Sequence, residues 1–234
     1  YFILRIAEEQ TASGKRLLDV LDIHFYPGET NPEDIVQLHR VYFDKTYVYP
    51  GANGVKRING GWDNNINKEY ILGRCEDWLN EHLGGNHGVT FGVSETGINS
   101  DDPNLCANWY ASTLGEFARN DVEIFTPWSW KKGMFEVIHL FSRYGQNYLV
   151  EGISDTEQYV SAYPTLNANA DSMTLFLVNR HLTETKSIEI DMKDFAIKNE
   201  AIKMYTLSNL PNNETFISHT QNALKTSELQ KPVF

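Results

Sequence analysis

The residues of this chain best suited to acid–base or nucleophilic chemistry stand at the ends of predicted strands. Residues 89–95 form a largely apolar, glycine-containing run that closes on Glu95 and is followed by Thr96 and Gly97. A carboxylate at the end of such a strand is costly to desolvate unless it is paired. Its position suits a nucleophile or a general acid–base catalyst. The alternative is a surface glutamate held in an ion pair.

A second group of polar residues lies on a predicted strand at residues 17–27. Asp22, His24 and Tyr26 are spaced two apart, so they share one face of that strand. The opposite, apolar face is expected to pack on helices, and the polar face to point into a barrel or crevice. The alternative is a hydrogen-bonded polar trio in a barrel core, without a role in chemistry.

Aromatic residues form the third group. Trp128 and Trp130 share one face at the end of a predicted strand over residues 123–130, and Trp62 lies in a polar segment rich in Asn and Tyr. Aromatic rings at the rim of a site bind the apolar face of a sugar. The alternative for the two strand residues is a pair of aromatics buried in the core. The alternative for the aromatics of residues 42–65, which include Trp62, is that they pack against one another inside a folded loop.

These residues would be positioned by alternating strands and helices. Strands are predicted at residues 17–27, 89–95 and 123–130, and helices at 2–9, 67–83, 103–119 and 134–145. Such alternation is typical of parallel βα units. Ligands bind outside the carboxyl ends of parallel strands, where the polar residues lie.

The pattern changes after residue 147. Short β-rich stretches at residues 159–163, 173–179, 187–190 and 201–207 are separated by Asn, Asp, Pro and Ser. We expect two domains, an α/β domain over 1–147 and a small β-sandwich over 148–234.

Composition excludes several classes of protein. The 234 residues include 20 Lys and Arg against 31 Asp and Glu, a formal net charge of −11 that argues against nucleic-acid binding. Two cysteines, Cys75 and Cys106, cannot build a disulfide scaffold or a four-thiolate zinc site, and the sequence leaves open whether they pair. The apolar runs are too short for a membrane span.

Three segments carry a resemblance to a known family. Residues 16–27 look like the sixth strand, 91–97 like the seventh and 124–128 like the eighth strand of a retaining clan A glycoside hydrolase. The chain most closely resembles the C-terminal part of family 44, whose members are endoglucanases and xyloglucanases with a (β/α)8 barrel followed by a β-sandwich. Residues 160–163 and 175–180 resemble strands of that sandwich.

The resemblance implies a mechanism. Glu95 would be the nucleophile of a retaining reaction, with a second carboxyl group about 5–5.5 Å away as acid and base. His24 and Tyr26 would hydrogen-bond the sugar or Glu95, Trp128 would form the floor of the subsite, and Trp130 and Trp62 would add sugar-binding surface. A cis peptide bond between Trp128 and Ser129 is a further expectation. The resemblance implies no cofactor; members of the family can carry a structural calcium, but no dense carboxylate loop stands out here.

The second carboxyl group is the missing part. In the clan it follows an Asn at the end of the fourth strand, yet the pairs Asn80-Glu81, Asn199-Glu200 and Asn213-Glu214 fall outside the predicted barrel strands. We expect strands six to eight to be present and one to five to be absent. The isolated chain would then be inactive and would need an upstream barrel half or a second chain as partner.

The expected substrate is a β-glucan or related plant polysaccharide, which implies a secreted or periplasmic protein. The alternatives are a non-catalytic carbohydrate-binding module, another clan A glycosidase, and a small unrelated α/β enzyme that uses Glu95 and His24.

Overall fold

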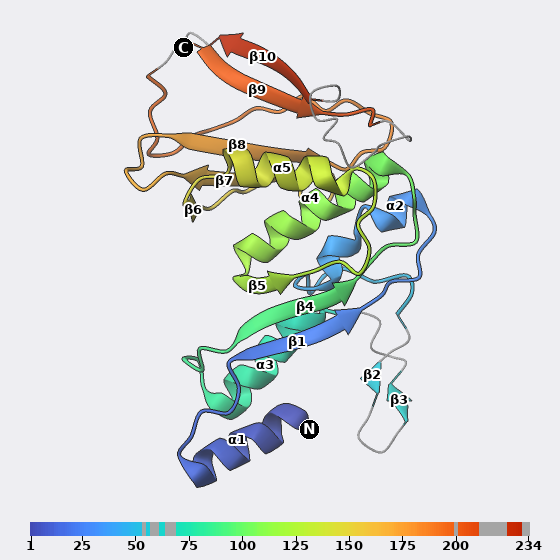
Figure 1. Ribbon diagram of the computed structural model, residues 1–234, viewed down its shortest axis with the longest axis vertical. Coiled ribbons are helices and arrows are strands. Elements are labelled where there is room, and N and C mark those ends of the chain that lie inside the picture. Colours follow the sequence, from blue (N-terminus) through green and yellow to red (C-terminus); the bar gives the residue numbers. More distant parts are fainter. Residues whose placement is uncertain (53–54, 57–60, 64–68, 199–200, 211–223, 231–234) are drawn as a thin grey trace. The chain divides into compact units, whose positions relative to one another are not determined.

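The structure is a computed structural model that describes residues 1–52, 55–56, 61–63, 69–198, 201–210 and 224–230 (Figure 1). The chain divides into two compact units, Tyr1–Ser100 with Ser112–Trp130, and Asp101–Ala111 with Lys131–Phe234. Helix α4 (Pro103–Arg119) contributes to both units. It begins with Pro103 in its first turn, where the missing N–H costs nothing.

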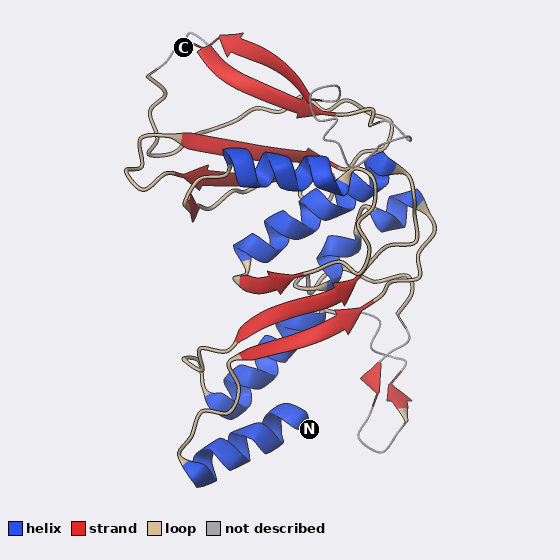
Figure 2. Ribbon diagram, in the orientation of Figure 1, coloured by secondary structure: helices blue, strands red, loops and turns tan. Residues whose placement is uncertain are grey.

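The first unit is built on a parallel sheet of three strands, which confirms the predicted βα alternation. Its strands are β1 (Val20–Phe25), β4 (Thr90–Thr96) and β5 (Val122–Phe125), in the order β1-β4-β5. Parallel neighbours need crossover connections, and helix α3 (Ile71–Leu83) precedes β4 as α4 precedes β5 (Figure 2). The carboxyl ends of the three strands therefore lie along one edge of the sheet.

An aromatic cluster forms much of the core of this unit. Tyr42 contacts Phe117 of α4 with ring centroids 4.7 Å apart, and Phe117 contacts Phe125 of β5 at 4.9 Å, both edge to face. Such pairs add about 0.5–1.5 kcal/mol each beyond the area they bury. Phe91 and Val93 bury the same apolar face of β4, which leaves Gly92 and Ser94 for the other face.

The described residues between β1 and α3 form several short elements. These are helix α2 (Pro32–Ile35), the 3-10 helix η1 (Leu38–Val41) and a small antiparallel pair, β2 (Val55–Lys56) with β3 (Trp62–Asp63). Tyr42 and Tyr49 are buried. These two aromatics belong to a packed core and do not line an open cleft, which was the alternative interpretation.

The amino-terminal helix α1 (Phe2–Ser13) covers the predicted helical residues 2–9. It ends at Gly14, whose backbone has the left-handed conformation (φ 66°) and whose N–H bonds the carbonyl of Gln10. Helix α1 contacts α3, on which Leu72 and Leu79 are fully buried.

The second unit carries two antiparallel sheets. One has the order β6-β7-β8, with β6 (Tyr148–Leu149), β7 (Val160–Leu166) and β8 (Met173–Asn179), and the other pairs β9 (Ala201–Leu207) with β10 (Leu224–Gln230). Helix α5 (Met134–Tyr144) stacks Phe141 on Phe176 of β8, with ring centroids 4.3 Å apart. The sandwich packing and the domain boundary at residue 147 stay predictions.

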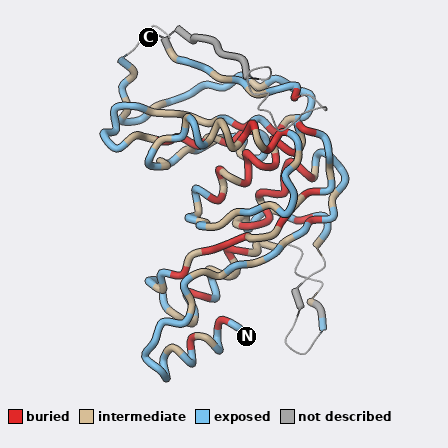
Figure 3. Tube along the Cα trace, viewed as in Figure 1, coloured by how far each residue is buried: buried red, intermediate tan, exposed pale blue. Residues whose placement is uncertain are grey.

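The strand predicted at residues 187–190 was wrong. These residues form no strand, and Ile188 and Ile190 are exposed. Alternation alone does not make a strand when no neighbouring strand supplies hydrogen bonds. Figure 3 shows that burial is instead concentrated in other elements, notably β4 and α4.

Candidate active site

The candidate site lies at the carboxyl end of the parallel sheet and is centred on Glu95. The register of β1 against β4 is regular up to the pair Ile23 and Val93, and the next pair is His24 with Glu95. Ser94 is therefore an extra residue on β4, as in a β-bulge. Bulges re-aim side chains and are frequent beside active sites. Here the bulge places His24 opposite Glu95.

Two side chains contact the same oxygen of Glu95. The Tyr26 hydroxyl donates a hydrogen bond to Oε2 at 3.0 Å, and Nδ1 of His24 lies 3.4 Å from that atom. Loss of hydration, the hydrogen bond to Glu95 and the charge of Glu95 together raise the pKa of Tyr26 above its ordinary value. The phenol thus remains a donor at neutral pH, and the Glu95 side chain remains 30% exposed to an incoming ligand.

A second layer of polar contacts lies behind His24. The backbone N–H of Ser94 donates to Oδ1 of Asp22 at 2.9 Å, and the Ser94 hydroxyl donates to Oδ2 of the same carboxylate. The Ser94 hydroxyl oxygen is also 3.2 Å from Nε2 of His24. A side chain at Gly92 would place its Cβ 2.8 Å from Oδ1 of Asp22, so this strand position has to be glycine for Asp22 to lie there.

The structure therefore brings together four of the predicted polar residues at this edge in one row of polar contacts, with Ser94 between Asp22 and His24. Asp22, His24 and Tyr26 share a face as predicted, and Glu95 meets them from the neighbouring strand. Ser94 was missed, because strict alternation puts residues 94 and 95 on opposite faces. Gly92 lies two residues before Ser94, and an isolated glycine in a strand often marks a bulge, but it does not specify which residue is the extra one.

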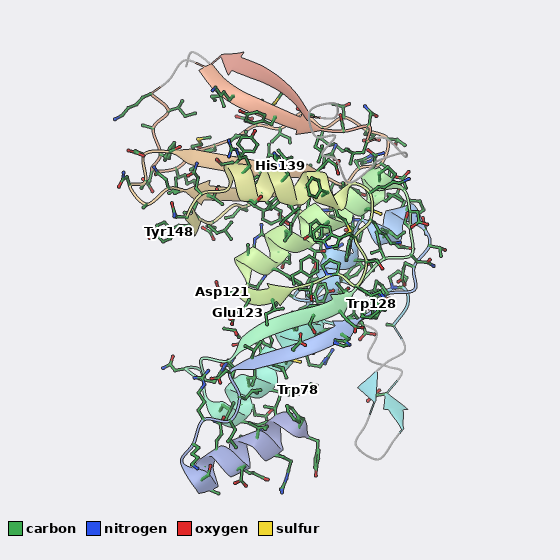
Figure 4. All side chains as sticks on the ribbon, in the orientation of Figure 1. Trp78, Asp121, Glu123, Trp128, His139 and Tyr148 are labelled. Carbon is green, nitrogen blue, oxygen red and sulfur yellow. The ribbon has the colours of Figure 1, made fainter. Side chains whose placement is uncertain are left out.

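The segment after β5 runs on beside β4 and carries Trp128 to the same edge. Thr126 donates through its N–H to the carbonyl of Val93 at 3.0 Å, and the Trp128 N–H donates to the carbonyl of Thr96 at 2.9 Å. Thr96 is fully buried, with its hydroxyl 3.4 Å from that of Tyr42. Figure 4 shows Trp128 beside the carboxyl ends of β1 and β4.

Trp128 and Trp130 are exposed, by 70% and 59%, so the alternative of a buried core pair does not hold. The predicted strand over 123–130 was too long, because β5 ends at Phe125 and strand alternation does not extend to the two tryptophans. The expected cis peptide bond at Trp128–Ser129 was wrong as well, since the described residues contain no cis peptide bond. Trp62 lies in β3, but its side chain is outside the described residues.

The described residues supply no Asn-Glu pair at the end of a strand of the parallel sheet. Asn80-Glu81 lies within α3, whereas Asn199-Glu200 and Asn213-Glu214 are outside the described residues. In the part of the chain that the structure describes, no group of three or more His, Cys, Asp or Glu could hold a metal ion.

None of the described helices is both long and apolar enough to cross a bilayer. Cys75 and Cys106 are free thiols, and burial raises the pKa of each to about 11. A thiol with so high a pKa is a weak nucleophile at neutral pH, which leaves Glu95 as the better candidate.

Comparison with known proteins gives matches in sequence and in fold. No family model matches the chain. A curated protein named beta-mannanase/endoglucanase A, from Caldicellulosiruptor saccharolyticus, is 21% identical over 220 residues, which is 82% of this chain and 16% of that protein.

Two solved structures have a similar fold over almost the whole chain. CelM2, a bifunctional glucanase-xylanase from a metagenome library, matches with a TM-score of 0.71 and 16% identity over 97% of this chain and 44% of its own. A family 44 endoglucanase from Clostridium acetobutylium matches with a TM-score of 0.69 and 18% identity, covering 98% of this chain and 48% of that one. The second neighbour is a family 44 enzyme, so the expected resemblance to glycoside hydrolase family 44 is confirmed in the fold. The chain spans less than half the length of either neighbour.

Proposed function

We propose that this chain is part of a retaining β-glycosidase of the endo-β-1,4-glucanase or xyloglucanase type, in which Glu95 is the nucleophile. The observation that carries the proposal is the double contact to one oxygen of Glu95, from Tyr26 and His24, at the carboxyl end of a parallel sheet. Donors fixed in this way orient a carboxylate and leave its other oxygen for attack. The similarity to family 44 structures supports the same assignment.

The reaction would proceed in two displacements. In the first, an oxygen of Glu95 forms a bond to the anomeric carbon as the glycosidic C–O bond breaks, and a second carboxylic acid gives its proton to the leaving oxygen. In the second, that carboxylate takes a proton from water, and the water oxygen displaces Glu95 from the sugar. Each displacement inverts the configuration at the anomeric carbon, so the two together retain it. Tyr26 and His24 would stabilise Glu95 as it is released.

The chain needs a partner for this chemistry. Among the described strands, β1 and β5 each have one neighbour in the parallel sheet, so both outer edges are open to further strands. Barrel closure would cover these edges. The proposed partner, an upstream barrel half or a second chain, would supply the remaining strands and the second carboxyl group.

The exposed tryptophans would take part in substrate binding. Trp128 offers an exposed aromatic face at the edge where Glu95 lies, and the exposed Trp130, together with Trp62, would extend this surface. The substrate would be a β-glucan or a related plant polysaccharide, and the protein would be secreted or periplasmic because such polymers do not enter cells. Residues 148–234 would form the accompanying β-sandwich.

The experiment is a complementation assay. The chain is assayed on a soluble β-1,4-glucan alone, and after fusion behind the first five βα units of a family 44 endoglucanase. We expect no steady turnover by the chain alone, turnover with retention of configuration by the fusion, and loss of that activity in the fusion carrying Glu95→Gln. Steady turnover by the chain alone that Glu95→Gln abolishes would contradict the need for a partner. A fusion unaffected by Glu95→Gln would contradict the role of Glu95.

A carbohydrate-binding module without catalysis is the second candidate. The exposure of Trp128 and Trp130 favours it, as does the lack of an Asn-Glu pair at a strand end among the described residues. A binding module would lose affinity for cello-oligosaccharides in Trp128→Ala and would keep it in Glu95→Gln. It would also never form a covalent bond to a sugar.

A further inference from the structure

The row of contacts from Asp22 through Ser94 and His24 to Glu95 contains more hydrogen-bond acceptors than protons to share among them. Asp22 accepts from both the N–H and the hydroxyl of Ser94. A serine hydroxyl carries a single proton, so its oxygen can meet His24 only as an acceptor. Nε2 of His24, which lies 3.2 Å from that oxygen, must then be the donor.

The other ring nitrogen faces an acceptor as well. Nδ1 of His24 lies 3.4 Å from Oε2 of Glu95, an oxygen that already accepts from Tyr26. This contact has the length of an ion pair, and it becomes attractive when Nδ1 carries a proton, because an ionised Glu95 has none to offer. A ring protonated at both nitrogens, with a positive charge, satisfies both neighbours.

We propose that Ser94, held by Asp22, is a positioning residue that keeps a proton on Nε2 of His24, so that His24 faces Glu95 as an imidazolium. The inference rests on the proposed function only for the role of Glu95 as nucleophile. A cation beside Glu95 stabilises its carboxylate form. That form is the one that attacks in the first displacement and is released in the second.

The surroundings of the ring support this proton arrangement. The titratable residues near the His24 ring on the β1 side are Asp22 and Tyr26. Asp22 is linked to the ring by its hydrogen bond from Ser94, and Tyr26 by its hydrogen bond to Glu95. From β4 the ring meets Ser94 and Glu95. The segment after β5 contributes the uncharged Thr126, whose hydroxyl donates to the carbonyl of Ser94 at 2.5 Å.

Glu123 of β5 bonds Thr90 at the amino end of β4, away from the ring. Two carboxylates and one imidazolium therefore make up the charges of the row.

Replacing Asp22 by asparagine would reverse the direction of the hydrogen bonds, because the new amide would donate to the Ser94 oxygen. The Ser94 hydroxyl could then donate to Nε2, and a neutral ring would satisfy both of its neighbours.

The test is nitrogen NMR at pH 7 on the whole chain labelled with ¹⁵N-histidine, which reports the protonation of each ring nitrogen. His24→Gln identifies the His24 signals. We expect both nitrogens of His24 to be protonated in the natural sequence. In Asp22→Asn the doubly protonated population should fall about tenfold or more, the factor expected for loss of one charge-assisted hydrogen bond. Ser94→Ala should shift the population in the same direction, and Ser94→Thr, which keeps the hydroxyl, should not.

The matched control is Asp19→Asn, which removes an equal charge just before β1, where Asp19 pairs with Arg16. Backbone amide spectra check that each variant keeps its fold. A neutral His24 in the natural sequence would overturn the proposal, as would an equal effect of Asp19→Asn. No sugar takes part in this measurement, so its result is separate from the fate of the proposed glycosidase function.

Discussion

The hydroxyl of Tyr26 donates to Oε2 of Glu95 at 3.0 Å, across 69 residues of sequence. Tyr26 follows β1 and Glu95 is the last residue but one of β4, so the contact depends on the parallel pairing of these two strands. Through this contact the pairing of β1 with β4 fixes the orientation of the Glu95 carboxylate, the candidate nucleophile.

Removing the Tyr26 hydroxyl should slow any reaction of Glu95. A hydrogen bond to a charged group is worth about 1.5–3 kcal/mol, so Tyr26→Phe should lower the rate at which an activated 2-fluoro-glycoside labels Glu95 by about 10–100-fold. Its effect on stability should be small, because half of the side chain is exposed. The control is Tyr148→Phe, an exposed tyrosine of the second unit. Equal labelling rates in both variants would show that the Tyr26 contact has no part in the reaction.

Adding a methyl group at Gly92 should destabilise the first unit. The new Cβ would lie 2.8 Å from Oδ1 of Asp22, and overpacking of this kind costs about 1–3 kcal/mol. The free energy of unfolding from urea titration measures the effect. Gly28→Ala is the matched control, because no atom lies within 4 Å of the methyl group it would add. If the two variants unfold at the same urea concentration, the close approach of Asp22 is not a constraint.

These contacts illustrate how far the sequence could predict the site. The alternation of Asp22, His24 and Tyr26 and the position of Glu95 at a strand end were readable from residue types, because side-chain direction in a strand follows a period of two. The bulge between β1 and β4 breaks that period, and the nearby Gly92 signals only that a bulge can form, not that Ser94 is the extra residue. Ser94 therefore became visible as a site residue only through its contacts with Asp22 and His24.

The elements themselves were predicted best where local signals agree. Helix α4 covers the residues expected of it, because Pro103 marks its start and its apolar residues follow the helical period. Strand β10 was not foreseen, since its polar sequence is specified by pairing with β9 and not by its own propensity. The prediction for residues 187–190 failed for the opposite reason. Their pattern suits a strand, but no strand among the described residues pairs with them.

The buried Tyr42 should make the first unit less stable at high pH. Burial, offset in part by the hydrogen bond with Thr96, raises the pKa of Tyr42 to about 12. Between pH 10 and 12 the unfolded chain loses the phenol proton and the folded chain keeps it, so unfolding becomes easier as pH rises. The free energy of unfolding should fall by roughly 1 kcal/mol per pH unit in this window through Tyr42 alone.

Comparison with Tyr42→Phe isolates this contribution. Urea unfolding at pH 9 and pH 11 should show a smaller loss of stability in Tyr42→Phe than in the natural sequence. Tyr148→Phe, which changes an exposed tyrosine, should lose as much stability as the natural sequence. If the free energy of unfolding falls equally between pH 9 and pH 11 in the natural sequence and in both variants, the pKa of Tyr42 is not raised.

Truncating Phe117 should open the aromatic cluster. Phe117 is 2% exposed and contacts both Tyr42 and Phe125. Replacement of a buried phenylalanine by alanine costs about 3–5 kcal/mol, which is a large part of the stability of an ordinary domain. Phe2→Ala, at an exposed position of α1, should cost far less. A thermal midpoint for Phe117→Ala close to that of Phe2→Ala would contradict the assignment of Phe117 to the core.

The most direct test of the central claim is to locate the covalent bond between sugar and protein. The chain is incubated with a dinitrophenyl 2-fluoro-cellobioside, whose leaving group needs no acid catalyst, and the labelled peptide is identified by mass spectrometry. We predict one sugar per chain, attached to Glu95, and no label in Glu95→Gln. A label on any other residue, or a label that persists in Glu95→Gln, would contradict the assignment of Glu95 as the nucleophile.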